Sequence, residues 1–518
     1  MIIKKTKNAV RGVIAGFIYK LITLLFPFAI RTVIIYKLGV EYVGLSSLFS
    51  AILNVLNLAE LGFSTAVVFS MYKPIAEDDK DSIRALLNAY RKIYKTIGFI
   101  VLFVGLAVTP FLKFLINGNY PVSINLYVLF LIYLANTVIS YFFFAYKTSL
   151  ISAHQRNDII STVNSIINIL MYISQIIVLM AFSNYYIYAI FIPCSSLVSN
   201  LVVGVVTKKM YPEYFCEGEI SVEQKKTIKS KVAALMVHKV GTVVQNSIDS
   251  LAISIFFGIT VLGIYNNYMY VATAIQGFIS IIFQSITAGL GNYVHKESVE
   301  KNYILFKRIL FINALVVSFC SICLIVLYQP FMRLWSIMSA GDTSVMLDMK
   351  VVISLVVLFY VNNIRHACGT YREALGIWDK DKWRPLCISI VNLVGTLICA
   401  YNGSLIGIII STIVAYLFVS LYWETSILYK NYFKKSSKDY FVKILLYTIV
   451  CILIGVIVFY TCSFIAIQGV WGFVLKVALC CALTVLLLVI SYISQDEFKF
   501  YFKKIFKLFR KEKNEEKN

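Results

Sequence analysis

Two basic residues stand inside the first long apolar stretch of the chain, which runs from Gly12 to Leu38. They are Lys20 and Arg31, eleven residues apart, and the stretch contains no carboxylate. Eleven residues of helix return to within about 20° of the starting direction, so both cations lie on one helix face. A cation inside a membrane helix costs roughly 2.5–3.5 kcal/mol and usually faces a bundle interior or a watery cavity. Paired cations at that depth predict a site for an anion.

Both cations also have simpler explanations. Lys20 lies close enough to the inner end of the helix to extend its ammonium group to the membrane surface. Arg31 could do the same at the outer end, or pair with Asp249 or Glu60 as a structural lock. Neither explanation accounts for two cations and no acid in one span.

Polar side chains recur in other apolar segments, and in the second and seventh segments their spacing places them on one helix face. They include Asn54, Asn57 and Glu60 in the second segment, His238, Gln245 and Asp249 in the seventh, Asn266 and Gln276 in the eighth, and Lys147 and Arg365 near the ends of the fourth and tenth. Such Asn stripes often serve only as hydrogen bonds between helices. Topology alone could place Lys147 and Arg365 near the membrane surface.

Composition identifies the elements that must hold these residues. The 518 residues are 59% hydrophobic and only 14% charged, whereas soluble domains are about 25% charged. The sequence therefore predicts an all-α polytopic membrane protein with about 14 transmembrane helices. The apolar segments are 12–38, 44–72, 92–116, 124–150, 158–182, 185–207, 232–257, 261–290, 303–330, 348–370, 384–401, 404–428, 441–465 and 470–494.

The connections between these segments alternate in charge. One set holds most of the 48 Lys and Arg residues, and the other set is short and nearly uncharged, as at 117–119 and 401–403. The positive-inside rule then predicts that both termini are cytoplasmic. The first segment is too long for a signal-peptide core, so we expect it to stay as a span. The net charge of +22 reflects topology and attraction to anionic lipid, not nucleic-acid binding.

The C-terminal tail, 496–518, has an amphipathic pattern. Phe498, Phe502, Ile505 and Phe509 fall on one helical stripe, and basic residues fall on the other side. This pattern predicts a cytoplasmic interfacial helix whose partner is anionic phospholipid.

An internal repeat relates the two halves of the chain. Gly39 and Gly44 lie at the start of the second segment, five residues apart. Gly258 and Gly263 have the same spacing at the start of the eighth segment, 219 residues later. Parallel repeats of six spans predict two lobes around a central cavity, with transport by rocking of one lobe against the other. The predicted divisions are an N-lobe (1–207), a cytoplasmic linker (208–231), a C-lobe (232–428), two C-terminal spans (440–495) and the tail.

Sequence signals for enzymatic chemistry are absent. The chain has no Gly-x4-Gly-Lys-Ser/Thr loop, no His-Glu-x-x-His and no Gly-x-Ser-x-Gly. Its 11 cysteines show no metal-ligand spacing, and no segment is long enough for an extramembrane catalytic domain. We therefore expect a transporter, not an enzyme, without metal or cofactor.

The stretch Arg31 to Val68 resembles the polysaccharide-flippase branch of the multidrug/oligosaccharidyl-lipid/polysaccharide exporter superfamily. The resemblance rests on the glycine-bounded connection and the motif Leu58-Ala59-Glu60-Leu61-Gly62, with a second-half partner at Ser247 to Ile253 followed by Gly258 and Gly263. It implies a flippase for undecaprenyl-pyrophosphate-linked oligosaccharides in the bacterial cytoplasmic membrane, working by alternating access, with or without ion coupling. A polysaccharide polymerase is a further expected partner.

The resemblance also implies roles for the polar residues. The candidates for pyrophosphate contact are Lys20, Arg31, Lys147 and Arg365. Asn54, Asn57, Gln245, Asn266 and Gln276 are candidates for sugar contact or cavity lining, and Glu60, Asp249 and His238 for gating or ion coupling.

Two alternatives stay open within the same superfamily. Fourteen spans also fit the lipid II flippase branch, although the motif around Glu60 favours the polysaccharide branch. Cation-coupled drug exporters commonly carry an acidic residue in the first span, and this chain has none there.

Overall fold

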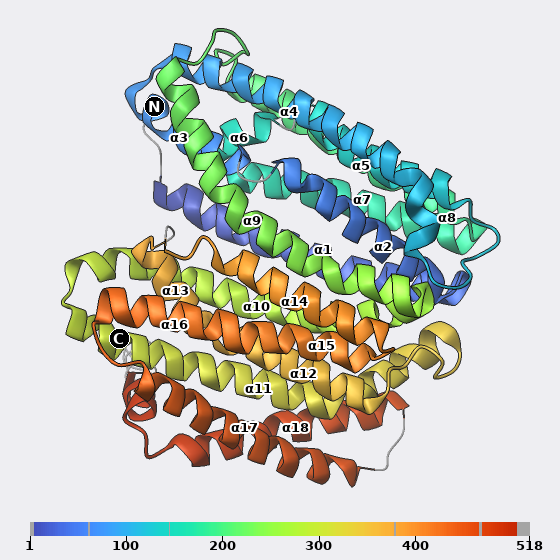
Figure 1. Cartoon of the computed structure of the whole chain (residues 1–518), viewed down its shortest axis with the longest axis vertical. Coiled ribbons are helices and arrows are strands. Elements are labelled where there is room, and N and C mark those ends of the chain that lie inside the picture. The colour runs from blue at the N-terminus through green and yellow to red at the C-terminus, as the bar shows by residue number, and fades with distance from the viewer. Residues whose placement is uncertain (1–4, 61–62, 144–145, 378–379, 466–468, 505–518) are drawn as a thin grey trace, which may run out of the picture. The chain divides into compact units, whose positions relative to one another are not determined.

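The computed structural model describes residues 5–60, 63–143, 146–377, 380–465 and 469–504, and these residues form helices and connections without a strand (Figure 1). The helices are α1 (Lys5–Lys37), α2 (Val40–Leu56), η1 (Asn57–Glu60), α3 (Phe63–Glu77), α4 (Lys80–Val108), η2 (Thr109–Leu115), α5 (Leu126–Phe142), α6 (Tyr146–Ala153), α7 (Asn157–Phe182), α8 (Tyr185–Met210), α9 (Val222–Phe257), α10 (Ile259–Lys296), α11 (Val299–Ala340), α12 (Met349–Ile364), α13 (His366–Leu375), α14 (Arg384–Tyr401), α15 (Leu405–Val414), η3 (Ala415–Leu421), α16 (Tyr422–Leu428), η4 (Tyr429–Phe433), α17 (Lys438–Ser463) and α18 (Gly469–Tyr492). A further helix covers 496–504.

The number of spanning helices depends on how interrupted helices are counted. Within the described residues, 12 helices are long and apolar enough to cross a membrane, and α5 with α6, bent by 53°, would make a thirteenth span. The predicted span 44–72 is divided into α2, η1 and α3. At 17 residues, α2 is only about 25 Å long, which is shorter than a hydrocarbon core of roughly 30 Å. Hydropathy alone registers a break of this kind as one continuous span.

By its internal contacts the chain divides into two units, which are described separately. Unit 1 contains residues 1–266, 338–345 and 385–403, and unit 2 contains residues 267–337, 346–384 and 404–518. The lobe boundaries drawn from the sequence repeat stay a prediction.

Unit 1 is a layered bundle of the first nine helices with most of α14. Within it α1 packs along α7, α5 along α4 and α8, and α2 along α9. Local capping fixes the helix starts. Asp79 accepts a hydrogen bond from the Ser82 amide at the start of α4, and Ser221 with Gln224 forms a capping box at the start of α9.

The repeated glycines contact each other's repeat within unit 1. A Cβ built on Gly44 would collide with the carbonyl oxygen of Ile259, and one built on Gly263 would collide with that of Val40. Ile259 and Gly263 lie 219 residues after Val40 and Gly44, which is the offset of the sequence repeat. The helix starts therefore approach with backbone in contact, and only glycine leaves enough space.

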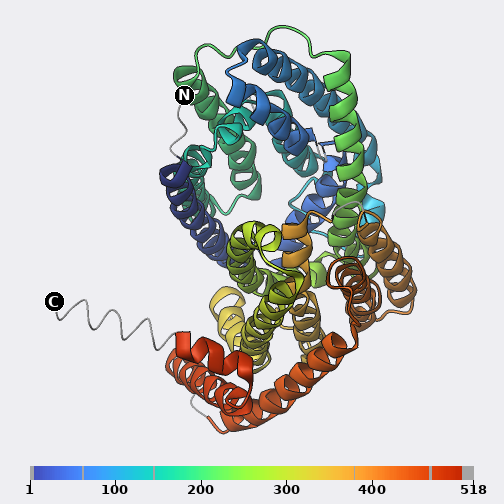
Figure 2. The same cartoon turned by 90° about the vertical axis from the view of Figure 1, so that its left-hand side faces the viewer.

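Unit 2 contains most of α10, α11 to α13, and the helices from α15 onward. α12 packs along α15, and α17 packs along α18 to form a C-terminal hairpin (Figure 2). The hydroxyl group of Tyr360 lies 2.9 Å from that of Thr448, which joins α12 to α17. Tyr492 stacks edge-on against Phe311 and Tyr447. The hairpin is therefore attached to the unit by specific side-chain contacts.

Candidate functional site

Helix α1 holds the two cations predicted to bind an anion. It has no acidic residue in its first turn, and Pro27 lies inside it. Proline removes one backbone hydrogen bond and bends a helix locally. Lys20, seven residues before Pro27, has an exposed side chain, whereas Arg31, four residues after it, is half-buried. Of the two, Arg31 has the more enclosed position.

Arg31 lies beside a cluster of buried tyrosines. Its charge is close enough to act electrostatically on the Tyr133 and Tyr188 side chains. The Tyr133 and Tyr185 hydroxyls are 3.1 Å apart, and Tyr185 donates to the Tyr42 carbonyl oxygen at 3.2 Å. A guanidinium group beside phenol hydroxyls provides charge-assisted donors together with neutral hydrogen-bonding groups. This combination can bind an anion that carries hydroxyl-bearing groups.

Other predicted residues of unit 1 have specific local partners. Lys147 in α6 donates to the Gly204 carbonyl oxygen of α8 at 3.2 Å. Asn57, at the end of α2, accepts from the Tyr141 hydroxyl group at 2.9 Å. Asn54 is exposed, and Asn266 donates to the Leu262 carbonyl oxygen within its own helix.

Asp249 lies in a polar contact between α9 and α14. One of its carboxylate oxygens accepts from the Asn392 amide at 3.3 Å and from the Thr396 hydroxyl group at 3.4 Å. Gln245, one turn earlier on α9, is buried, and its amide nitrogen has no hydrogen-bond partner among the described residues. A half-buried acid with neighbouring hydroxyl and amide groups suits gating or the exchange of a proton or cation.

The structure says less about three other predicted residues. Gln276 is half-buried in the part of α10 that belongs to unit 2. The side chains of Glu60 and His238 lie outside the residues whose side chains the structure describes.

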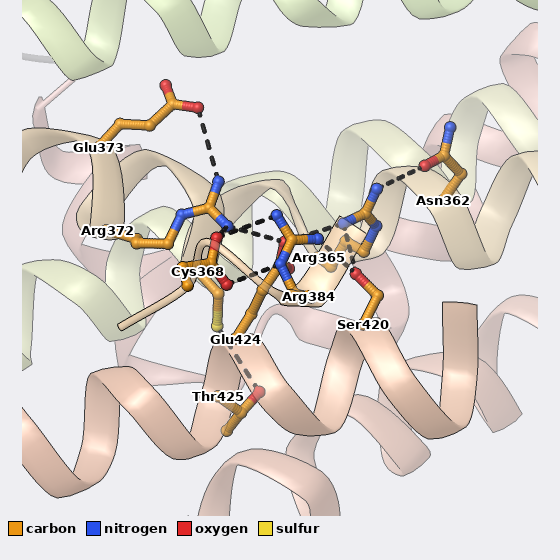
Figure 3. Close-up of polar contacts among 10 residues, drawn as sticks. Asn362, Arg365, Cys368, Arg372, Glu373, Arg384, Ser420, Glu424 and Thr425 are labelled. Atoms are coloured by element: carbon orange, nitrogen blue, oxygen red, sulfur yellow. Dashed lines mark hydrogen bonds and ion pairs between the residues drawn. The ribbon is translucent and has the colours of Figure 1, made fainter. Parts of the chain in front are cut away.

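Arg365 belongs to a buried charge cluster in unit 2 (Figure 3). It donates to Glu424 at 2.9 Å, to the Ser420 hydroxyl group at 2.7 Å and to Asn362 at 2.9 Å. Its guanidinium group also lies 4.8 Å from the centre of the Tyr416 ring. Arg365 is thus fixed on several sides while 19% of its side chain stays exposed.

Two more arginines complete this cluster. Arg384 pairs with Glu424 at 2.8 Å and with Asp381 at 2.8 Å, and Arg372 pairs with Asp381 and, at 3.3 Å, with Glu424. Three guanidinium groups therefore surround two carboxylates that are almost completely buried, and the more exposed Glu373, 3.8 Å from Arg372, brings the formal charge to zero. Buried charges are tolerated only when partners of this quality compensate their desolvation.

Interrupted helices bring the cluster together. Arg365 lies between α12 and α13, and Asp381 lies in the connection to α14. Ser420 belongs to η3, a π-helical segment just before Glu424. Such departures from regular helix often mark functional positions.

The sequence reasoning selected Arg365 but not Arg372, Asp381, Arg384 or Glu424. One signal was present, because Glu424 is the only carboxylate in the apolar segment 404–428, and an acid inside a span requires a partner. The sequence gives no spacing from which those partners follow. No cluster of His, Cys, Asp or Glu suited to a metal ion occurs in the described part of the chain.

The fold and these sites can now be compared with known proteins. The family model described as polysaccharide biosynthesis protein matches residues 9–287, which is more than half of the chain. The chain belongs to the polysaccharide biosynthesis protein family. This membership confirms the resemblance drawn from the stretch Arg31 to Val68. No curated protein matches the sequence of this family member closely enough to count as a relative.

Solved structures confirm the predicted all-α membrane fold of this polysaccharide biosynthesis protein. An inward closed lipid II flippase MurJ superposes with a TM-score of 0.62 and 14% identity, covering 93% of this chain and 99% of that one. An inward-facing multidrug resistance MATE transporter of the MOP superfamily gives 0.58 at 15% identity, covering 77% and 93%. A MOP superfamily transporter from Pyrococcus furiosus gives 0.51 at 15% identity, covering 83% and 97%. The protein is therefore a multi-pass membrane protein with the MOP transporter fold.

Proposed function

We propose that the protein is a flippase that moves an undecaprenyl-pyrophosphate-linked oligosaccharide from the inner to the outer leaflet of the bacterial cytoplasmic membrane. The observation that carries the proposal is Arg31, a half-buried cation beside tyrosine hydroxyls in an apolar helix without an acid. A lipid-linked pyrophosphate needs cations within the membrane, and its sugars need neutral hydrogen-bonding groups. Membership of the polysaccharide biosynthesis family supports this choice of substrate.

In this proposal the work is done by binding and conformational change, and no covalent chemistry is needed. Arg31 and Lys20 contact the pyrophosphate, with Lys147 and Arg365 as further contacts. Asn54, Asn57, Gln245, Asn266 and Gln276 serve the sugars or the cavity wall. Asp249, Glu60 and His238 control gating or couple an ion. Both termini are cytoplasmic, the tail binds anionic phospholipid, and a polysaccharide polymerase accepts the product.

The experiment is a flipping assay in proteoliposomes that contain a pyrophosphate-linked oligosaccharide. Loss of a charge-assisted hydrogen bond is worth about 1.5–3 kcal/mol, so we expect Arg31→Ala to slow flipping by roughly 10- to 100-fold. Arg31→Lys keeps the charge without the planar fork and should retain intermediate activity. Lys113→Ala removes an exposed cation in η2 and serves as the control.

Two results would decide against parts of the proposal. Full flipping by the Lys20→Ala, Arg31→Ala double variant would remove the phosphate role of both residues. Flipping of lipid II but not of the oligosaccharide would assign the protein to the function named for its structural neighbour MurJ. Transport of cationic drugs with neither lipid substrate would instead favour an exporter.

A further inference from the structure

An apolar cavity of about 420 Å³ lies in unit 2 between the end of α10 and the start of α11. Its lining residues are Ile286, Gly289, Leu290, Tyr293, Leu305, Ile309, Ile312 and Tyr501. Along α10 the lining extends from Tyr293, near the connection between the two helices, to Ile286. This distance is about two helical turns, or about 10 Å. The cavity is therefore parallel to the helices, which is also the direction of lipid chains in a bilayer.

The helix at 496–504 forms part of the wall of this cavity. Tyr501 contributes to the lining. The ring centre of the adjacent Phe500 lies 3.5 Å from the guanidinium group of Arg308. Glu497 at the start of this helix pairs with Lys443 of α17 at 2.8 Å. The helix is thus held against unit 2 by a charged contact and an aromatic contact.

A cation lies beside the part of the cavity wall that Tyr501 and Ile309 form. Arg308 directly precedes the lining residue Ile309 on α11, and its charge acts on Tyr501. Among the described residues no carboxylate lies within ion-pair distance of Arg308. Lys307, the preceding residue, adds a second positive charge, so two basic residues of α11 lie next to the apolar cavity.

We propose that this cavity is a binding site for an anionic phospholipid, with one acyl chain between α10 and α11 and the headgroup phosphate at Arg308. An apolar cavity with basic residues beside it, next to the sequence-predicted cytoplasmic end of the helices, complements such a lipid. A volume near 420 Å³ is at the small end of ligand pockets, which span roughly 300–1,000 Å³. It suits a single acyl chain and is too small for a whole polyprenyl chain. The site does not depend on which substrate the protein transports.

Two neighbouring glycines on α10 allow a matched test. A Cβ added at either Gly289 or Gly291 meets no atom within 4 Å, but only Gly289 lines the cavity. Gly289→Leu therefore fills the cavity without a backbone clash, and Gly291→Leu makes the same change of residue elsewhere. Arg308→Gln removes the charge beside the cavity, and Lys301→Gln removes a cation of α11 that is already paired with Glu297.

The probe is phosphatidylglycerol with a photoreactive acyl chain, added to phosphatidylcholine nanodiscs that contain the full-length protein. We expect cross-links to peptides 286–293 and 305–312, lowered roughly tenfold by Gly289→Leu and unchanged by Gly291→Leu. Arg308→Gln should lower phosphatidylglycerol labelling by about tenfold, the usual order for a charge-assisted contact. Labelling by the matching phosphatidylcholine probe should not change, and Lys301→Gln should resemble the wild type.

Equal labelling of the wild type and a folded Gly289→Leu variant would overturn the proposal. Displacement of the phosphatidylglycerol probe by polyprenyl pyrophosphate, but not by unlabelled phosphatidylglycerol, would assign the cavity to the transported lipid instead. If Gly289→Leu fails to fold, Arg308→Gln decides the question, because unchanged lipid preference in that variant also contradicts the site.

Discussion

Individual residues in this protein are best understood through their charge partners. Arg31 and Arg365 were both candidates for contact with a pyrophosphate, yet their surroundings differ. Arg31 is close enough to Tyr133 and Tyr188 to act on them electrostatically, whereas Arg365 is held by Glu424, Ser420 and Asn362. Arg365 therefore contributes first to the local structure of the cluster. Arg31 lies in an apolar helix without an acidic residue, and for this reason it is the better test of the proposed substrate contact.

Glu424 is the residue on which the buried cluster depends, since all three arginines contact it. Removing one partner of a buried ion pair costs about 3–5 kcal/mol, so we expect Glu424→Gln to lower the thermal unfolding temperature strongly. The measurement is unfolding in detergent, followed by intrinsic fluorescence.

Glu373 provides the control for this substitution. Its carboxylate lies 3.8 Å from Arg372 and is 44% exposed, and exposed pairs contribute at most about 1 kcal/mol. Glu373→Gln should therefore leave the unfolding temperature nearly unchanged. Similar shifts for the two variants would contradict the structural role given to Glu424.

At the scale of elements, helix interruptions and close helix approaches determine where functional groups lie. The break between α12 and α13 presents Arg365, and the π-helical η3 presents Ser420. The contact between α2 and the start of α10 depends on two glycines instead of side-chain packing. These local irregularities indicate the positions of the polar groups better than the surrounding apolar surfaces do.

We predict that Gly44→Ala and Gly263→Ala both destabilise the protein. Each added methyl group meets a backbone carbonyl of the other repeat, and overpacking costs typically 1–3 kcal/mol. Gly291→Ala is the control, because its Cβ would meet open space and alanine favours helix by up to about 1 kcal/mol. The unfolding temperature in detergent tests this, and a neutral effect at Gly44 or Gly263 would exclude the close approach.

The contact of the helix at 496–504 should depend on pH. Burial raises the pKa of Glu497, but the hydrogen bond and charge of Lys443 outweigh it, so the net pKa is lowered. A lowered folded-state pKa means that the contact stabilises fully above the unfolded pKa of about 4.3. That stabilisation is lost as pH falls through the folded value.

Amide hydrogen exchange of 496–504, corrected for intrinsic rates, measures this effect. We expect protection at neutral pH that falls below about pH 4, and Glu497→Gln should show low protection already at neutral pH. Asp496→Asn changes an exposed neighbouring carboxylate and should behave as the wild type. Equal protection in all three proteins would show that the ion pair does not hold the helix.

For the whole molecule, the orientation in the membrane is the property that charge alone predicts. The connection 208–231 is basic and is predicted to be cytoplasmic, whereas 401–403 is uncharged and is predicted to face outward. Cys216 is half-exposed in the first of these connections, and Asn402 is exposed in the second.

Labelling with a membrane-impermeant maleimide tests this orientation. In a Cys216→Ser background, Asn402→Cys should react in intact cells. In the otherwise native protein, Cys216 should react only after the cells are permeabilised, and the signal should be absent from Cys216→Ser. The reverse pattern would invert the topology and make the lipid site at α10 and α11 face outward.

The sequence by itself determined the class of this protein, its membrane segments and the family it resembles. Long apolar runs and alternating loop charge are properties of chain segments, and bilayer thickness converts them directly into spans. The shared helix face of Lys20 and Arg31 could also be predicted from the sequence, because both residues belong to one helix. Even the contact between repeats left a signal in the spacing of Gly39, Gly44, Gly258 and Gly263.

Only the tertiary structure decided which polar groups meet. Glu424 lies 59 residues from Arg365 in the chain, and Asp249 lies 143 residues from Asn392. No spacing rule reaches across such separations, because those pairs are set by how separate helices pack. The division of 44–72 into α2, η1 and α3 likewise depends on packing, as does the cavity that Tyr501 helps to line. In this protein the bilayer determines which segments form spanning helices, and the contacts between helices determine which polar groups form the sites.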